Sequence, residues 1–465
     1  TRPFGSVPCR VARPVYAPEG HRVDRIDVDG ASTPPCRTRG YLRRMQLDTG
    51  SIARCVPGSR PDATHISLGG PAPASASAFD VDGLLTDTAG YSIAAIDHLG
   101  AARGVPTASR HLDPAHLLAF CTTHLELNGE PVPAWGELSG VYPTHDGRHL
   151  QIHCNFAHHA AGVVQRLGCG ADRSSVAAAI ALRDAFDLEE ELIAAGMIAA
   201  VVRTLDEWAA HPHNHATIEL PVLSVERVGD APPIVDPQDR NGSPLDGLRI
   251  LDCSRVLAGP VAGQVLAASG ADVLRVGADH LPSVPVGVMS TGFGKRNTSL
   301  DLRAPGDADV MHALLAEAHV WIDAYRPHAL EQLGYTAERA AARRPGLVVG
   351  QSSAFDWTGP WSGRRGVDSI VQSTTGIRHA GGVYARDAFG RPTDPGPLGL
   401  PVQALDYATG FMAAGVAAQL VAHQRNVGGS WLARLSLLRT RNLLVDRRPA
   451  EPFVPAAVEI DPGLL

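Results

Sequence analysis

Residues 245–353 alternate short apolar runs with segments of helical spacing, and this alternation constrains the fold more than any other feature of the chain. The apolar runs lie at 248–252, 270–276, 320–323 and 347–353. Strands and helices that alternate at such short intervals predict parallel strands joined by crossover helices, that is, a doubly wound, Rossmann-like α/β sheet. Ligands of such sheets bind at the carboxyl ends of the strands. The loops predicted to hold a site are therefore 253–260, 292–303, 323–328 and 352–368.

The chain is long enough for more than one hydrophobic core. It has 465 residues, which makes two domains the first expectation. A Pro-, Asp- and Gly-rich stretch at 231–244 is typical of a linker. We therefore predict four parts: an irregular segment at 1–78, a smaller α+β domain at 79–240, the Rossmann-like domain at 241–445 and a C-terminal tail at 446–465.

Local patterns within 79–240 predict several elements. Residues 141–153 predict a β-hairpin, because Asp146 and Gly147 lie at a turn between two apolar runs. The stretches 156–167 and 174–202 both have helical spacing.

Composition excludes several classes of function. The net charge of −7 argues against nucleic-acid binding through general basicity. The longest apolar run, at 192–202, is too short to span a bilayer, and no secretory signal opens the chain. We therefore expect a cytoplasmic protein without a membrane partner. The seven cysteines are scattered and form no C-x-x-C pair, so we expect reduced thiols and no bound metal.

Lys295 is the single lysine among 41 basic residues. A lysine retained where arginine is so strongly preferred is a candidate for a role that needs a compact charge, such as contact with a phosphate. Chance retention explains it as well.

Several motifs of the second half stand in a characteristic order. They include L-D-G-L-R-I-L-D at 245–252, V-L-A-G-P at 256–260, K-R-N-T-S-L-D-L-R at 295–303, G-V-D-S-I-V-Q at 366–372 and L-D-Y-A-T-G at 405–410. Together they resemble the class III CoA-transferase family of the CaiB/BaiF type, which also includes 2-methylacyl-CoA racemases.

The first half resembles the smaller domain of the same family, through T-H-D-G-R-H-L-Q-I at 144–152 and T-L-D-E-W at 204–208. In the family this domain follows the Rossmann-like half, whereas here it precedes it. Residues 85–121 also resemble a second copy of 405–440. The resemblance therefore implies rearranged halves that meet in an interlocked homodimer or by pairing with a homologous chain.

The resemblance implies that Asp406 is a nucleophilic carboxylate, which forms acyl intermediates without a metal or redox cofactor. From the residues alone, Asp406 is better explained as a helix N-cap, and only the ordered motifs favour the catalytic role. Coenzyme A is implied as substrate and product, with no permanently bound cofactor. The implied CoA-binding residues are Leu257, Ala258, Lys295, Leu300, Asp301, Leu302, Arg303, Tyr325, Arg326, Arg365, Gly366, Val367 and Asp368.

The reaction implied is transfer of CoA from an acyl-CoA to a carboxylic acid, through an aspartyl anhydride and an aspartyl-CoA thioester. Racemases of the family tend to have histidine where Val367 stands here, and a two-base racemisation without it lacks one base. Two alternatives stay open: a racemase-type isomerase, and a non-catalytic CoA-binding subunit.

Overall fold

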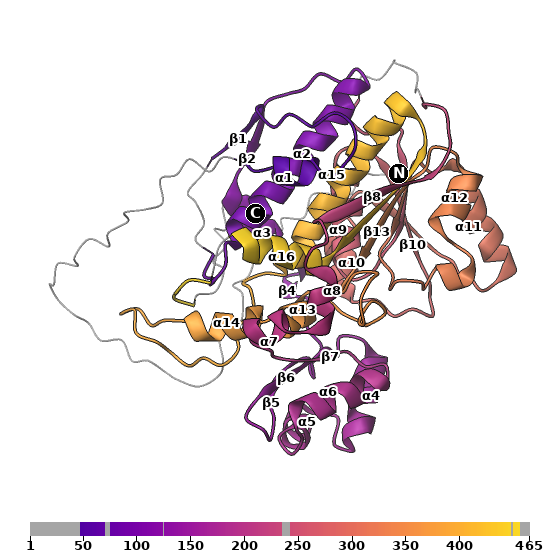
Figure 1. Cartoon of the computed structure of the whole chain (residues 1–465). Helices are drawn as coiled ribbons and strands as arrows, with labels where there is room; N and C mark the ends of the chain where they lie inside the picture. The colour runs from indigo at the N-terminus through magenta and orange to yellow at the C-terminus, as the bar shows by residue number, and fades with distance from the viewer. Residues whose placement is uncertain (1–46, 70–74, 124, 235–241, 448–449, 456–465) are drawn as a thin grey trace.

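The computed structural model describes residues 47–69, 75–123, 125–234, 242–447 and 450–455, and its centre is a seven-stranded sheet (Figure 1). The strands of that sheet are β8 (Leu223–Gly229), β9 (Arg249–Cys253), β10 (Asp272–Gly277), β11 (Lys295–Ser299), β12 (Val320–Asp323), β13 (Val348–Ser353) and β14 (Ser430–Ser436).

Strand order confirms the predicted Rossmann-like sheet. The order is β11-β10-β9-β12-β13-β14-β8. All neighbouring pairs are parallel except β14 and β8, which are antiparallel. The direction of winding reverses between β9 and β12, and this switch point is where ligands bind in doubly wound sheets.

Helices cover both faces of the sheet, because its strands bury side chains on both sides. Helices α11 (Pro305–Glu317) and α12 (Ala337–Arg343) pack on the face that contains Leu251 and Trp321. Helices α9 (Ala258–Ala268) and α15 (Ala404–Val427) pack on the opposite face, and α2 (Val81–Ala102) forms a further layer over α15 (Figure 1).

Helix α15 lies between α9 and α2, and glycines let it approach both. A Cβ atom on Gly410 would lie 2.6 Å from the Ala258 carbonyl oxygen of α9, and one on Gly415 would lie 2.7 Å from the Tyr91 ring of α2. By length and composition α15 is apolar enough to cross a membrane, but 94% of its apolar window is buried inside the fold. It is therefore packed as a core helix.

A separate small unit consists of β5 (Gly140–Pro143), β6 (His149–Ile152) and β7 (Ala199–Val201) with α4 (Ala157–Leu167), α5 (Arg173–Ile180) and α6 (Ala185–Ala194). The predicted hairpin is confirmed as β5 and β6, with Gly147 at φ +74° in the turn. The helical prediction for 174–202 is wrong at its end, because Gly196 at φ +79° follows α6 and the buried strand β7 pairs with β6.

Elements on the two sides of the predicted domain boundary at 240 pack together. Strand β8 belongs to the large sheet although it precedes residue 240, and α2 packs on α15 rather than on the small unit. The boundary prediction rested on linker composition, which marks a change of path and not which elements share a core.

The suggested repeat has a structural counterpart. Helix α2, strand β2 (Arg110–Leu112) and helix α3 (Pro114–Phe120) follow one another as α15, β14 and α16 (Leu437–Arg447) do. Strand β2 pairs in parallel with β1 (Ile66–Leu68), as β14 pairs with β13. The remaining elements are α1 (Gly50–Ala53), β3 (Glu126–Leu127), β4 (Glu130–Pro131), α7 (Leu205–Ala209), α8 (Pro212–Thr217), α10 (Pro285–Ser290), the 3-10 helix η1 (Glu331–Leu333), α13 (Asp368–Thr374) and α14 (Ile377–Tyr384).

Candidate active site

A pocket opens at the switch point of the sheet, beyond the carboxyl ends of β9, β12 and β13. Three of the four segments predicted as loops line it. The fourth, at 292–303, does not, and the loop prediction for it is wrong, because residues 295–299 form the edge strand β11. Its lining residues are Arg255, Val256, Ala258, Gly259, Ala324, Tyr325, Arg326, Pro327, Ser352, Ser353, Ala354, Arg364, Gly366, Val367, Asp406 and Leu437.

Asp406 lies in this pocket, within the first turn of α15. Its side chain is 5% exposed, and its carboxylate accepts a hydrogen bond from the backbone N–H of Ala258, at the start of α9. The N-cap of α15 is Gln403. Asp406 is therefore not the cap of its helix, and the alternative interpretation of this residue as an N-cap is wrong.

Asp368, at the start of α13, accepts the hydrogen bonds of backbone N–H groups at the start of α15. Its carboxylate accepts hydrogen bonds from the backbone N–H groups of Leu405 and Asp406, the latter at 3.0 Å. The Gln372 side chain donates to its second oxygen. Asp368 is fully buried and does not line the pocket, which contradicts its predicted contact with CoA. Its carboxylate instead pairs with backbone N–H groups that have no hydrogen-bond partner within α15.

The pKa values of both carboxyl groups are raised. Burial raises the pKa of Asp368 to about 6. Burial and then the nearby Asp368 charge raise the pKa of Asp406 well above its ordinary value, although the Ala258 N–H opposes the shift. A carboxyl shifted in this way, inside a pocket, is a candidate functional group.

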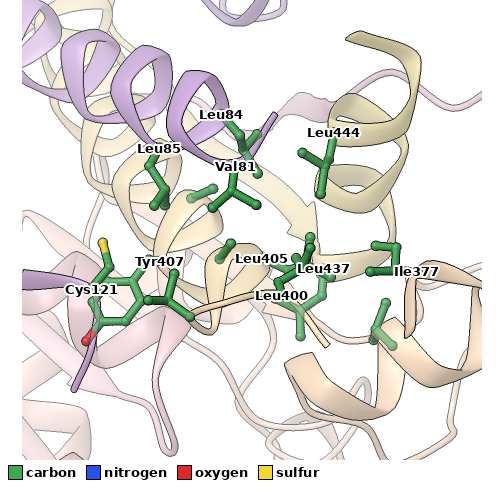
Figure 2. Close-up of a cluster of buried hydrophobic side chains, with 14 of the residues drawn as sticks. Val81, Leu84, Leu85, Cys121, Ile377, Leu400, Leu405, Tyr407, Leu437 and Leu444 are labelled. Carbon is green, nitrogen blue, oxygen red and sulfur yellow. The ribbon is translucent and has the colours of Figure 1, made fainter. Parts of the chain in front are cut away.

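Apolar packing fixes the start of α15. Leu405 and Tyr407, the neighbours of Asp406, lie among buried side chains of α2, α14 and α16 (Figure 2). The Tyr407 hydroxyl also lies 3.0 Å from the hydroxyl of Thr123. The position of Asp406 is thus set by a core that includes the N-terminal part of the chain.

Three arginines gather near the pocket. Arg255 and Arg326 line it. Burial, then Arg326 and Arg255, lower the pKa of Arg365, which places the three guanidinium groups within electrostatic reach of one another. Arg255 also lies 4.9 Å above the Phe156 ring of the small unit and donates to the Pro282 carbonyl. Clustered cations of this kind favour anion binding.

Of the other residues predicted to bind CoA, some line the pocket and some lie in the hydrophobic core. Tyr325, Gly366, Val367 and Ala258 line the pocket, whereas the Leu257 side chain is buried in the neighbouring apolar cluster. Burial raises the pKa of Tyr325 to about 12.

The prediction that Lys295 contacts a phosphate is wrong for this structure. Its ammonium group is fully buried, where it lies 2.7 Å from the Asp252 carboxylate and donates to the Pro260 carbonyl at 2.6 Å. Lys295 therefore joins β11 to β9 and to the first turn of α9, and its charge is neutralised within the protein.

Residues 300–303 lie beyond β11, away from the pocket. Leu300 is buried under α11, and Arg303 donates to both oxygens of the Asp301 carboxylate, at 2.8 and 2.7 Å. Leu302 packs partly against the same cluster as Leu300. The structure does not bring these four residues together with Asp406.

The pocket also contains residues that the sequence did not single out. Arg255, Ser352, Ser353 and Arg364 line it. They lie in segments that were predicted to form the site, but they belong to none of the sequence motifs. Loop position beyond a strand was the available signal for all four.

Comparison with known proteins finds a family match in the second half of the chain. Residues 245–454 match the model of CoA-transferase family III. This part of the chain is therefore similar to that family.

The chain spans about half the length of the curated relatives it matches. It is 33% identical over 205 residues to the probable fatty acyl-CoA transferase Rv3272 of Mycobacterium tuberculosis, which covers 41% of this chain and 50% of that protein. It is 32% identical to the acetyl-CoA:oxalate CoA-transferase of Acetobacter aceti, over 40% of this chain and 49% of that protein. A crystal structure of Rv3272 aligns with a TM-score of 0.37 and 28% identity, covering 47% of this chain and 58% of that chain.

Proposed function

We propose that this protein transfers CoA from an acyl-CoA to a carboxylic acid, with Asp406 as the nucleophile. The observation that carries the proposal is the position of Asp406: a buried carboxyl at the switch-point pocket, with a backbone N–H of a second helix on its carboxylate. The match of residues 245–454 to the model of CoA-transferase family III supports the same reaction class.

In the proposed reaction, the ionised Asp406 carboxylate attacks the acyl-CoA carbonyl and expels CoA as its thiolate, which leaves a mixed anhydride. The thiolate then attacks the Asp406 carbonyl, releases the donor acid as its carboxylate and forms an aspartyl-CoA thioester. The acceptor carboxylate repeats both steps in reverse and leaves as acyl-CoA. The protein ends with Asp406 unchanged.

The surrounding groups have distinct tasks in this proposal. The Ala258 N–H and the start of α9 stabilise the negative charge that develops at the attacked carbonyl. Arg255, Arg326 and Arg365 bind phosphates of CoA, with backbone donors near Gly366. Tyr325 and Val367 contact the remainder of the CoA chain.

Partners are part of the proposal. CoA and a carboxylic acid are the substrates, and we propose no permanently bound cofactor. The rearranged order of the halves suggests that a complete site forms in an interlocked homodimer or with a homologous chain.

The alternative with a racemase-type mechanism has less support. Such a reaction needs a second base beside Asp406, and the described lining of the pocket includes no histidine. Val367 lines the pocket where the racemases tend to have one.

Intact-protein mass measured after incubation with a panel of acyl-CoAs and hydroxylamine tests the proposal. Hydroxylamine converts an anhydride or thioester on Asp406 to a stable hydroxamate. We expect a defined mass increase in the wild type and none in Asp406→Asn. Asp387→Asn, in an exposed turn that does not line the pocket, is the matched control and should keep the increase.

Absence of any mass change with every acyl-CoA, despite measurable CoA binding, would contradict covalent transfer. That result would favour the isomerase or the non-catalytic subunit.

A further inference from the structure

A buried cluster of two arginines and one glutamate lies beside the pocket. Arg203 and Arg364 both pair with Glu189 of α6, at 2.5 and 2.9 Å, and the three side chains are at most 5% exposed. Arg203 follows β7 of the small unit, whereas Arg364 lies in the loop beyond β13. The cluster therefore joins the small unit to the wall of the pocket.

The charges of this cluster do not balance. Two guanidinium groups share one buried carboxylate, so the cluster carries one net positive charge. The nearby Glu190 is exposed, where water screens its charge. Glu207 lies within electrostatic reach of Arg203, but its carboxylate is paired with Arg148 at 2.7 Å. His211 adds no further positive charge, because burial and Arg203 lower its pKa to about 4 and leave it neutral near pH 7. A buried cation without a matching anion is costly.

Arg364 is the member of the cluster that reaches the pocket. It lines the pocket together with Asp406. Its Nη2 atom contacts Glu189 and donates to the Ala199 carbonyl at 3.3 Å, but its buried Nε atom has no hydrogen-bond partner among the described residues. The guanidinium thus keeps unused donor capacity as well as unbalanced charge.

The plane of the guanidinium is held in place. It stacks on the Trp361 ring at 3.8 Å from the ring centre, and Glu189 fixes its Nη2 end. A planar, preorganised guanidinium matches the two oxygens of a carboxylate. Arg364 is distinct from the outer arginines, because Arg255, Arg326 and Arg365 form their own cluster.

We propose that Arg364 binds a carboxylate carried by the acyl part of the substrate, so that the pocket prefers dicarboxylic over monocarboxylic acyl groups. This inference rests on the proposed function, in which the acyl carbonyl of the substrate reacts at Asp406. The distal carboxylate supplies the missing negative charge, while the other end reacts at Asp406. Arg364 then acts as a specificity residue and takes no part in bond making.

Matched pairs of substrates that differ by one carboxylate test this proposal. The probes are succinyl-CoA against butyryl-CoA as donors, and malonate, succinate and glutarate against propionate, butyrate and valerate as acids. Transfer rates and equilibrium binding by calorimetry are measured for the wild type, Arg364→Met and Arg364→Lys. Arg249→Met is the control, because Arg249 pairs with Glu317 at the exposed surface and does not line the pocket.

Arg364→Met leaves Arg203 and Glu189 as a balanced pair, so we expect it to fold. In the wild type we expect the dicarboxylic member of at least one pair to be preferred by about tenfold or more, the effect of one charged hydrogen-bonded contact. Arg364→Met removes this preference with little change for the monocarboxylic probe, Arg364→Lys keeps part of it, and Arg249→Met keeps all of it. Comparing the acyl-CoA donors with the free acids shows whether Arg364 recognises the carboxylate of the donor, of the acceptor or of both.

Turnover without any dicarboxylic preference in the wild type overturns the inference and leaves the proposed function intact. Preferential binding of a dicarboxylic probe that Arg364→Met abolishes, without turnover, supports the inference and overturns the transferase. Equal binding of both members of every pair, or binding of neither, overturns the inference whatever the turnover.

Discussion

Asp406 and Asp368 meet at one buried end of α15, and their shared position governs how the site responds to pH. Asp406 must be ionised to attack, but burial and the Asp368 charge raise its pKa. Activity through Asp406 should therefore rise with pH.

Asp368→Asn removes the charge and keeps an oxygen that accepts from the α15 amides. Because the like charge disappears while burial stays, the pKa of Asp406 should fall without reaching its ordinary value. We expect the rate of hydroxamate formation to reach half its maximum at lower pH than in the wild type. The rate measured between pH 5 and 9 checks this, and an unchanged midpoint would show that the two groups are not coupled.

The same pair makes stability depend on pH. A carboxyl whose pKa is raised in the folded state stabilises the fold below its unfolded pKa, near 4, and this contribution is lost as pH rises through the folded pKa. For Asp368 the loss falls between about pH 4 and 6, and for Asp406 it extends higher. Asp406→Asn, which has no charge to bury, should therefore exceed the wild type in unfolding free energy by an amount that grows from pH 5 to pH 8.

Urea unfolding at both pH values measures this difference. A constant gap between the two proteins would contradict the raised pKa of Asp406.

Lys295 and Arg296 are neighbours on β11 with opposite surroundings, which makes them a matched pair. Lys295→Met leaves the Asp252 carboxylate buried without its cation, and breaking a buried pair in this way costs about 3–5 kcal/mol. Arg296→Met removes an exposed pair with Asp272, which contributes about 1 kcal/mol or less. Urea unfolding should separate the two variants clearly, and equal losses would contradict the structural role assigned to Lys295.

At the scale of elements, the contact between α15 and α9 brings the Ala258 N–H to Asp406. Gly410→Ala places a methyl group 2.6 Å from the Ala258 carbonyl oxygen. The helices must separate, which should cost about 1–3 kcal/mol and slow hydroxamate formation. Gly306→Ala, in α11 with open space around it, is the control and should leave both the melting temperature and the rate near the wild-type values.

Most sheet strands of the second half could be predicted from the sequence, because each is a short apolar run bounded by polar or glycine residues. Strand β12 matches its predicted bounds, and β9 differs by one residue. Strand β7 could not be predicted in the same way. Its three small apolar residues continue the composition of α6, and only pairing with β6 distinguishes them as a strand.

The candidate site was predictable as a set of loops and less so as a set of side chains. Asp406, Tyr325 and Arg326 line the pocket, and their roles stay predictions. Lys295 and Asp368 do not line it, because a charged residue in a motif can serve a buried pair or a helix end as readily as a ligand. Arg364 belongs to no motif, and its environment depends on Glu189, 175 residues earlier in the chain by their numbers.

At the scale of the whole molecule, segments before the predicted domain boundary at residue 240 pack with segments after it. Residues before 240 supply β8 to the large sheet and α2 to the layer over α15. Local composition predicts where a chain turns, but which distant segments share a core depends on complementary surfaces that no local window contains. For this reason the domain limits were the least predictable feature.

The layer of α2 over α15 also has a consequence for how the chain reaches its native state. The Tyr91 hydroxyl of α2 donates to the Gln419 side chain of α15 at 2.8 Å, across 328 residues of sequence. During synthesis, α2 emerges long before the helix that covers its apolar side. Contacts of such high sequence separation form slowly, and an early helix with an uncovered apolar face is prone to aggregate. Binding of the nascent first half by a chaperone, with release only after α15 has been made, is the behaviour we expect of this chain in the cell.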